Sequence, residues 1–172
     1  MPFHLEPLQE AHFEPLHHVF DAIARERRFL TFTEAGPKEL TLEYYRKVLA
    51  GGHTHFVAVQ DGQVLGWCDV LPVFGQMRAH VGVLGMGVAA PARGQGVGKT
   101  LIQAAIARAT QRGLSRIELT VNSDNHVALG LYSSQGFVHE GTQRGGWCLE
   151  GRYFDVHYMA RLNTEVQHDH AT

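Results

Sequence analysis

Hydrophobic residues in the first fifty positions recur with the period of an α-helix. The first such stretch follows a short extended segment at residues 3–5, and its apolar positions are spaced i, i+3, i+4 and i+7. These positions are Leu16, Val19, Phe20 and Ile23. After the break at Gly36-Pro37, Thr41 is the candidate N-cap of a second, shorter helix that ends at Gly51-Gly52. We expect the two helices to form a flap.

Two strand-like segments on either side of an Asp-Gly pair then predict a β-hairpin. Residues 56–59 and 64–70 flank the Asp61-Gly62 pair, which supplies the positive φ angles that a tight hairpin turn requires. A third strand is expected at residues 79–88. It is unusually rich in glycine, which predicts either a bulge or a close approach of its backbone to a ligand. The glycines are Gly82, Gly85 and Gly87.

The second half of the chain alternates between helix and strand. One apolar stripe predicts a helix over residues 98–112, closed by Gly113. Candidate cap residues at positions 123–125 begin a further helix, which ends before Gly136. Strands are expected at residues 117–121, 137–143 and 153–159. Strands and helices in this order predict an α/β (α+β) fold.

Length and composition fit a single folded domain. The chain has 172 residues, of which 44% are hydrophobic and 19% charged. We place the domain at residues 1–162 and expect residues 163–172 to be a disordered polar tail. The net charge of -2 gives no general attraction to nucleic acid or to an anionic membrane, so neither is an expected partner.

The two cysteines and the N-terminus favour a cytoplasmic protein. Cys68 and Cys148 have neither CxxC nor zinc-ligand spacing, so reduced thiols are the simplest interpretation. Nothing before Pro7 resembles a signal peptide, and no apolar run is long enough to cross a membrane.

A glycine-rich loop between the third strand and the long helix is the strongest candidate for chemistry. It comprises Arg93, Gly94, Gln95, Gly96, Val97 and Gly98, and Lys99 follows it. Backbone N–H groups at the start of a helix bind anions, glycines let a phosphate approach, and the cations add positive charge. A Walker A motif requires a glycine where Arg93 stands, and the spacing does not match a dinucleotide-binding GxGxxG motif. We therefore expect a phosphate-binding loop of another kind.

At these residues the chain resembles the GNAT superfamily of N-acetyltransferases. Arg93, Gly96 and Gly98 match the signature R/Q-x-x-G-x-G/A, and the strand before the loop and the Asn125-to-Tyr132 segment after it stand in the family's order. The resemblance covers roughly residues 56–159. It implies the GNAT fold, a mixed, mostly antiparallel, splayed sheet flanked by about four helices. It also implies acetyl-CoA as co-substrate, bound in the gap between two central strands.

The resemblance assigns roles to further residues. It places the thioester carbonyl against the backbone of Met86, Gly87 and Val88. Tyr132 is the candidate general acid for the departing thiolate, and a phenol with an ordinary pKa near 10 is protonated at neutral pH. An ordinary core tyrosine is the alternative. Asn125 either contacts the pantetheine or simply caps the helix that contains Tyr132.

The general base is left open. Many family members have a glutamate on the glycine-rich strand where this chain has Gly82. His80 is the candidate replacement because strand side chains alternate and histidine titrates near neutral pH, although a structural role fits it equally. A water chain to Asp69 or Asp155 would also serve. The histidines lack metal-ligand spacing such as HExxH, so no metal is expected.

The acceptor is expected to be a small primary amine such as an amino acid. Phe29, Phe32, Tyr44 and Tyr45 would form an apolar wall, or would only pack the two helices. Arginines at positions 78, 144 and 152 could bind a carboxylate, and Asp69 or Asp155 could hold the ammonium group. The alternatives are a protein N-terminal or lysine acetyltransferase and a non-catalytic acyl-CoA-binding regulator, with a homodimer left open.

Overall fold

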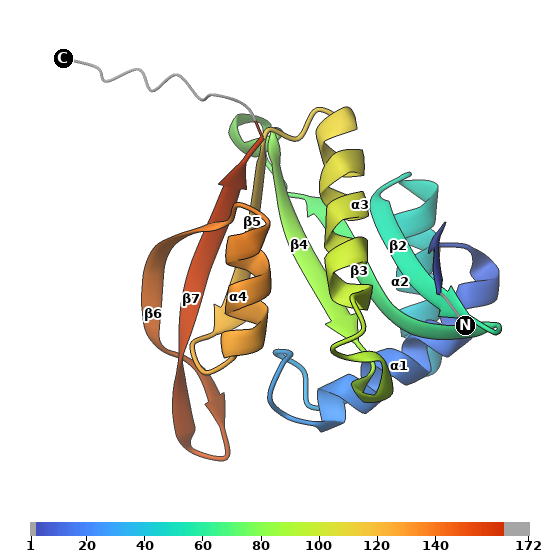
Figure 1. The fold of residues 1–172 in the computed structure, drawn as a ribbon, viewed down its shortest axis with the longest axis horizontal. Coiled ribbons are helices and arrows are strands. Elements are labelled where there is room, and N and C mark those ends of the chain that lie inside the picture. Colours follow the sequence, from blue (N-terminus) through green and yellow to red (C-terminus); the bar gives the residue numbers. More distant parts are fainter. Residues whose placement is uncertain (1–2, 164–172) are drawn as a thin grey trace.

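The protein is described by a computed structural model over residues 3–163, so the predicted tail beyond Asn163 lies outside the described residues. The elements follow one another along the chain as shown in Figure 1. They are β1 (His4–Pro7), η1 (Glu10–His12), α1 (Phe13–Arg25), α2 (Lys38–Ala50), β2 (Thr54–Gln60), β3 (Gln63–Pro72), η2 (Gln76–Arg78), β4 (Val81–Val88), η3 (Ala90–Ala92), α3 (Val97–Gln111), β5 (Arg116–Asn122), α4 (His126–Ser134), β6 (Val138–Leu149) and β7 (Arg152–Leu162).

The seven strands found in residues 3–163 form one sheet in the order β1-β2-β3-β4-β5-β7-β6. Among the strands of the described residues, only β4 and β5 pair in parallel, and the other neighbours are antiparallel, which confirms the expected mixed, mostly antiparallel sheet. The parallel pairing is short, running from Val81 opposite Arg116 to Val83 opposite Glu118. Beyond these residues the two central strands separate. Within residues 3–163, no helix is both long and apolar enough to cross a membrane.

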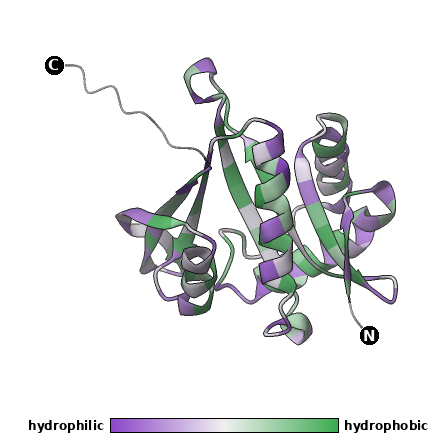
Figure 2. Ribbon diagram, turned by 45° about the horizontal axis from the view of Figure 1, so that its top comes forward, coloured by the Kyte–Doolittle hydropathy of each residue, from purple (hydrophilic) through white to green (hydrophobic). Residues whose placement is uncertain are grey.

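Two hydrophobic cores lie on opposite faces of the sheet. Helices α3 and α4 cover one face, where Leu101 and Ile102 of α3 pack with Ile117 of β5. On the other face, Leu16 and Ile23 of α1 belong to a core with residues of α2, β2 and β3. Helices α1 and α2 are therefore part of the folded core, and the expectation that they form a flap is wrong. Figure 2 shows the hydrophobic residues concentrated in the central strands between these helical layers.

Two local expectations meet different outcomes. The Asp61-Gly62 turn is confirmed, because these residues have φ angles of 50° and 77° and join β2 to β3. The expected N-cap at Thr41 is wrong, since α2 begins at Lys38 with Pro37 as its N-cap residue. Pro37 has an extended backbone conformation, with a ψ of 133°, and the helix begins at the next residue. The Thr41 hydroxyl instead donates to the Pro37 carbonyl at 3.2 Å.

The glycines of β4 create space for side chains of neighbouring elements. A Cβ on Gly82 would lie 2.5 Å from Val70 Cγ1, and a Cβ on Gly87 would lie 2.5 Å from the Trp67 ring. The β3–β4 register runs from Gly66 opposite Val88 to Pro72 opposite Gly82 with no shift, so β4 contains no bulge at these positions. Of the two readings of this glycine-rich strand, the bulge is therefore wrong.

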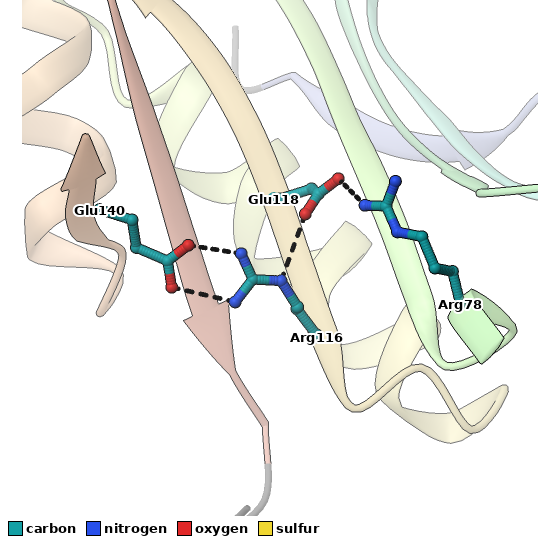
Figure 3. A network of polar contacts seen from close by, with 4 residues as sticks. All are labelled: Arg78, Arg116, Glu118 and Glu140. Carbon is teal, nitrogen blue, oxygen red and sulfur yellow. Dashed lines mark hydrogen bonds and ion pairs between the residues drawn. The ribbon is translucent and has the colours of Figure 1, made fainter. Parts of the chain in front are cut away.

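A four-residue ion network crosses the closed end of the β4–β5 pairing (Figure 3). Arg78, just before β4, donates to Glu118 on β5 at 2.5 Å. Arg116 Nε donates to the same carboxylate at 3.2 Å, and its terminal nitrogens hold Glu140 at 2.9 and 2.5 Å. Arg116 and Glu118 are three-quarters buried. The network therefore reinforces the short stretch in which β4 and β5 are paired.

Substituting Glu118 by glutamine should therefore lower the stability of the fold. The change removes the charge that both Arg78 and Arg116 contact, and we expect a loss of about 1 kcal/mol, or about 2–4 °C in Tm. Thermal unfolding followed by circular dichroism measures it. The matched control is Glu43→Gln, because Glu43 pairs with Lys47 on the exposed face of α2 and should leave Tm unchanged. Equal shifts in the two variants would contradict a special role for the network.

Candidate functional site

A cavity of about 680 Å³ opens where β4 and β5 separate. It is bounded by the end of β4, the loop before α3, the end of β5, helix α4 and the end of α1. Its lining residues are Ile23, Arg28, Phe29, Met86, Gly87, Val88, Ala92, Arg93, Gly94, Gly98, Thr120, Val121, Asp124, Asn125, His126, Val127, Ala128, Leu131 and Tyr132. Eight of the candidate catalytic and cofactor-binding residues meet here, although they come from three separate segments of the chain.

The loop before α3 has the conformation of an anion-binding helix start. Gly94 and Gly96 adopt φ angles of 74° and 83°, in the left-handed region, and Gly96 is the residue that precedes the helix. The first N–H groups of α3 are free of intrahelical partners by geometry, and the helix dipole adds positive potential there. The loop therefore presents backbone donors to an anion at the mouth of the cavity.

Not every residue of this loop faces the cavity. Arg93, Gly94 and Gly98 line it, whereas Val97 is 1% exposed and belongs to the core with α3. The Gln95 amide donates to the Pro91 carbonyl at 2.7 Å and so holds the loop in shape. Gly96 acts through its backbone conformation, and the Lys99 side chain is exposed to solvent near the helix start.

Arg93 is engaged by partners that the sequence did not reveal. Its guanidinium forms a bidentate pair with Glu26, at 2.8 and 2.5 Å, and its Nε donates to the Val88 carbonyl at 2.9 Å. It also lies over the Phe29 ring, 4.7 Å from the centroid. In this arrangement Arg93 joins the loop to the end of β4 and to the segment after α1. Glu26 is 67 residues away in the chain, and no local motif indicated the contact.

The end of β4 offers unpaired backbone to the cavity. Met86, Gly87 and Val88 all line it, and the described part of β5 pairs with β4 only as far as Val83. Backbone N–H and C=O groups that point towards β5 beyond that residue are therefore available to a ligand. The Trp67 ring packs against the other side of Gly87, where a larger residue would displace it.

Helix α4 brings Tyr132 and Asn125 to the opposite wall. Tyr132 is 8% exposed, its ring packs against Phe137 with centroids 5.9 Å apart, and it lines the cavity. Burial, helped by the nearby Cys68 thiol, raises the pKa of Tyr132, so the phenol stays protonated at neutral pH. The Asn125 side chain accepts a hydrogen bond from the Ala128 N–H at 3.2 Å, which is the capping interaction. Asn125 also lines the cavity.

His80 lies away from the other candidates. It is exposed in the turn before β4, and its carbonyl accepts from the N–H groups of Ser115 and Arg116 at 3.0 and 3.2 Å. Six residues of strand separate it from Met86, which corresponds to about 20 Å. The sequence-based prediction included His80 in the strand, but β4 begins at Val81. The alternation of strand side chains therefore does not apply to His80. The structure therefore does not bring His80 to the cavity.

The two aspartates named from the sequence have different surroundings. Asp155 is exposed, and its Oδ1 accepts from the Gly145 N–H at 2.8 Å. The Asp69 side chain is 16% exposed, and its Oδ2 lies 4.0 Å from His55 Nδ1. Among residues 3–163, no group of three or more histidines, cysteines or carboxylates is arranged to hold a metal ion.

The residues expected around an acceptor are spread over several places. Arg78 is committed to Glu118, and Arg152 lies over the Phe154 ring at 5.7 Å from the centroid. Tyr45 is buried in the core, whereas Phe32 and Tyr44 are 58% and 46% exposed. Phe29, assigned to the acceptor wall, instead lines the cavity beside Arg93. The sequence also missed Asp124 and His126, which line the cavity beside Asn125.

Comparisons with known proteins point to one family. The model for the acetyltransferase (GNAT) family matches residues 17–137, well over half of the chain. The chain is 34% identical over 112 residues to the L-amino acid N-acetyltransferase AaaT of Escherichia coli (strain K12), covering 64% of this chain and 69% of that protein. It is 24% identical over 139 residues to a putative ribosomal protein bS18-alanine N-acetyltransferase of Bacillus subtilis (strain 168), covering 80% and 84%.

A solved structure has the same fold. The structure of a putative acetyltransferase from Salmonella typhimurium with its cofactor acetyl-CoA matches with a TM-score of 0.90. The match covers 100% of both chains, at 16% sequence identity.

Proposed function

The chain belongs to the acetyltransferase (GNAT) family, and from this premise we propose that it transfers the acetyl group of acetyl-CoA to the primary amine of an amino acid or a close derivative. Membership makes it an N-acetyltransferase that uses acetyl-CoA as co-substrate. One observation carries the proposal. A single cavity joins the anion-binding start of α3, the unpaired end of β4 and a protonated tyrosine.

The pyrophosphate of acetyl-CoA is assigned to the loop. The positive φ angles of Gly94 and Gly96 turn successive backbone N–H groups outwards at the start of α3, and anions bind such groups. Because Glu26 already neutralises Arg93, the backbone donors and Lys99 supply the attraction in this arrangement. The rest of the loop contributes shape, through the Gln95 contact with Pro91 and the buried Val97.

The thioester is assigned to the end of β4. The backbone of Met86, Gly87 and Val88 faces the cavity beyond the last β4–β5 pair, and an N–H group there can stabilise the charge that develops on the carbonyl oxygen. Asn125 fixes the start of α4 through its cap and stands beside the same cavity. It can contact the pantetheine without giving up that cap, because an amide group has donors as well as an acceptor.

Tyr132 is assigned the role of general acid. Acyl transfer breaks the C–S bond, and the sulfur that leaves needs a proton. The buried Tyr132 phenol lines the cavity and remains protonated because its pKa is raised. Packing against Phe137 gives the ring a fixed position on α4, as a proton donor requires.

A small amine is favoured as acceptor over a polypeptide. The relative with 34% identity is an L-amino acid N-acetyltransferase, whereas the ribosomal-protein enzyme is 24% identical. Phe29, an aromatic residue of the segment after α1, lines the cavity. Arg28 also lines the cavity and is a candidate partner for a carboxylate.

Acceptor preference is tested by following CoA-thiol release with acetyl-CoA and a panel of amines. We expect free amino acids to give the highest kcat/KM, with spermidine and an N-terminal peptide behind them. A compact acceptor fits a cavity that acetyl-CoA largely fills, whereas a peptide requires an open groove. A preference for the peptide of about tenfold or more corresponds to about 1.4 kcal/mol of differential transition-state binding. That result would contradict the amino-acid proposal and would make a protein N-terminus the acceptor.

A further inference from the structure

We infer that the carboxylate of Asp69, supplied by β3, accepts the proton that the acceptor ammonium loses before its nitrogen attacks the thioester. The inference rests on the proposed function and adds the general base to it. Asp69 lies on β3, next to the strand that borders the opening, on the sheet face that carries α1 and α2, whereas β4 itself offers no carboxylate.

Strand register places Asp69 beside the opening. His55, Asp69 and Gly85 form one row across β2, β3 and β4, so their side-chain positions share a face. The last β4–β5 pair is Val83 with Glu118, and Gly85 is two residues further along β4. In Figure 1, β3 runs next to β4, and β5 diverges on the other side. Asp69 is therefore one strand away from the gap.

Glycine at position 85 gives the carboxylate its access. An added Cβ there would lie 3.1 Å from Asp69 Oδ1, so the carboxylate occupies the space above the Gly85 backbone. No side chain of β4 stands between it and the gap in that row. Two residues further on, about 7 Å along the strand, Gly87 lines the cavity proposed for the thioester. In the proposed arrangement, the acceptor amine approaches the thioester carbonyl from the Asp69 side of β4.

The titratable neighbours of Asp69 leave its charge uncompensated. Across β2, burial lowers the pKa of His55 to about 4, with His12 contributing, so His55 is neutral at pH 7. On α2, burial raises the pKa of Tyr44 and of Tyr45, and both phenols remain neutral. In β3 itself, burial raises the pKa of the Cys68 thiol well above its usual value. Among the described side chains, no arginine or lysine pairs with Asp69.

These surroundings suit a proton acceptor near neutral pH. Burial raises the pKa of Asp69 to about 7, and hydrogen bonds from the Gly85 N–H and the Trp67 side chain offset this only in part. Glu118, on the same face, is instead paired with Arg78 and Arg116. A base whose pKa lies near the working pH transfers protons most effectively.

The proton balance closes with the groups already placed. Asp69 takes one proton from the acceptor ammonium and releases it to water. The neutral nitrogen then bonds to the thioester carbon while the carbonyl pair moves to oxygen, and its return breaks the C–S bond. Tyr132 protonates the sulfur, and the second proton, which the nitrogen loses on becoming an amide, restores the Tyr132 phenol. One ammonium and one thioester give one amide, one thiol and one released proton.

Asp69→Asn tests the inference directly, because asparagine keeps the shape and cannot take up the proton. We expect kcat/KM for the acceptor at pH 7 to fall by ~10²- to 10⁴-fold, with acetyl-CoA affinity by calorimetry nearly unchanged. The wild-type profile of kcat/KM against pH should break near 7, and the variant should lack this break. Glu118→Gln, a carboxylate on the same face outside the proposed machinery, is the matched control and should keep the break.

A second readout needs no turnover. Because folding raises the pKa of Asp69 from its ordinary 3.8 to about 7, the folded protein binds more protons than the unfolded chain between these values. Wild-type stability should therefore fall as pH rises through this window. The Tm of Asp69→Asn should exceed that of the wild type at pH 8, and the gap should shrink as pH falls towards 4. Carbon-13 NMR of the Asp69 carboxyl should show a midpoint near 7 in the free protein.

The outcomes separate the inference from the function on which it rests. If the wild type releases no CoA thiol with any amine in the panel, the proposed function fails and the inference falls with it. If the wild type turns over and Asp69→Asn does so equally well, only the inference is overturned. If Asp69→Asn only raises the KM for the acceptor and keeps the pH break, Asp69 is a group that binds the acceptor, and the inference is also overturned.

Discussion

Acetyl-CoA binding should weaken by about 100-fold or more when Gly96 is replaced by valine, since the loop would lose one or two hydrogen bonds to a charged group. Gly96 has a φ of 83°, and a β-branched residue is strained there, so the backbone must move away from the left-handed region. That movement redirects the N–H groups proposed to hold the pyrophosphate. Isothermal calorimetry on the folded variant measures the change in Kd.

Gly113 provides the matched control for this substitution. It follows the other end of α3 with a φ of 87°, and a Cβ at either glycine would meet nothing within 4 Å. Gly113→Val should therefore cost similar backbone strain while leaving acetyl-CoA affinity unchanged. Equal losses of affinity in the two variants would show that the effect comes from strain in α3, and wild-type affinity in Gly96→Val would remove the loop from the binding site. Alanine at both positions gives a milder pair if valine prevents folding.

Turnover should fall by ~10²- to 10⁴-fold when Tyr132 is replaced by phenylalanine, with acetyl-CoA affinity nearly intact. The change removes only the hydroxyl, which the mechanism requires once the C–S bond begins to break, so kcat should fall while ground-state binding stays. Steady-state kinetics at saturating acetyl-CoA, with a solvent-viscosity test for rate-limiting release, measures this.

The packing role of Tyr132 can be separated from its chemistry. Phenylalanine keeps the contact with Phe137, so Tm should change little. Tyr153→Phe removes a hydroxyl from a residue that is 74% exposed on β7, and it should retain wild-type turnover. If Tyr132→Phe turns over at the wild-type rate while chemistry limits the rate, Tyr132 is a core residue and another group protonates the sulfur.

Local patterns in the sequence predicted most elements of the fold. The helical spacing of Leu16 to Ile23, the Asp61-Gly62 turn and the apolar stripe of α3 are determined by residues close together in the chain, and each is found in the structure. The family motif also identified the loop before α3. These features need no knowledge of distant contacts, which is why periodicity and turn chemistry were sufficient for them.

Features that depend on register and distant contacts could not be predicted in the same way. The glycines of β4 predicted either a bulge or a close approach of the backbone to a ligand, but the space they leave for the side chains of Val70, Asp69 and Trp67 is visible only in the structure. Arg93 was expected to face an anion, and its pairing with Glu26 joins segments far apart in the chain. Asp69 gains its significance from pairing with Gly85, which the sequence of β3 alone does not show.

The early separation of β4 from β5 leaves the protein with two strand edges inside its sheet, in addition to the outer edges at β1 and β6. An exposed edge invites strands from other molecules and can start aggregation. The inner edge of β4 is a poor template for such pairing, because it contains Gly85 and Gly87, which lower β-propensity, and extends only from Leu84 to Val88. Helices α3 and α4 stand on one side of it and α1 on the other, so an incoming strand has little room while a slender ligand can still enter. The glycines of β4 thus leave the binding gap open and at the same time disfavour pairing of this edge with strands of other molecules.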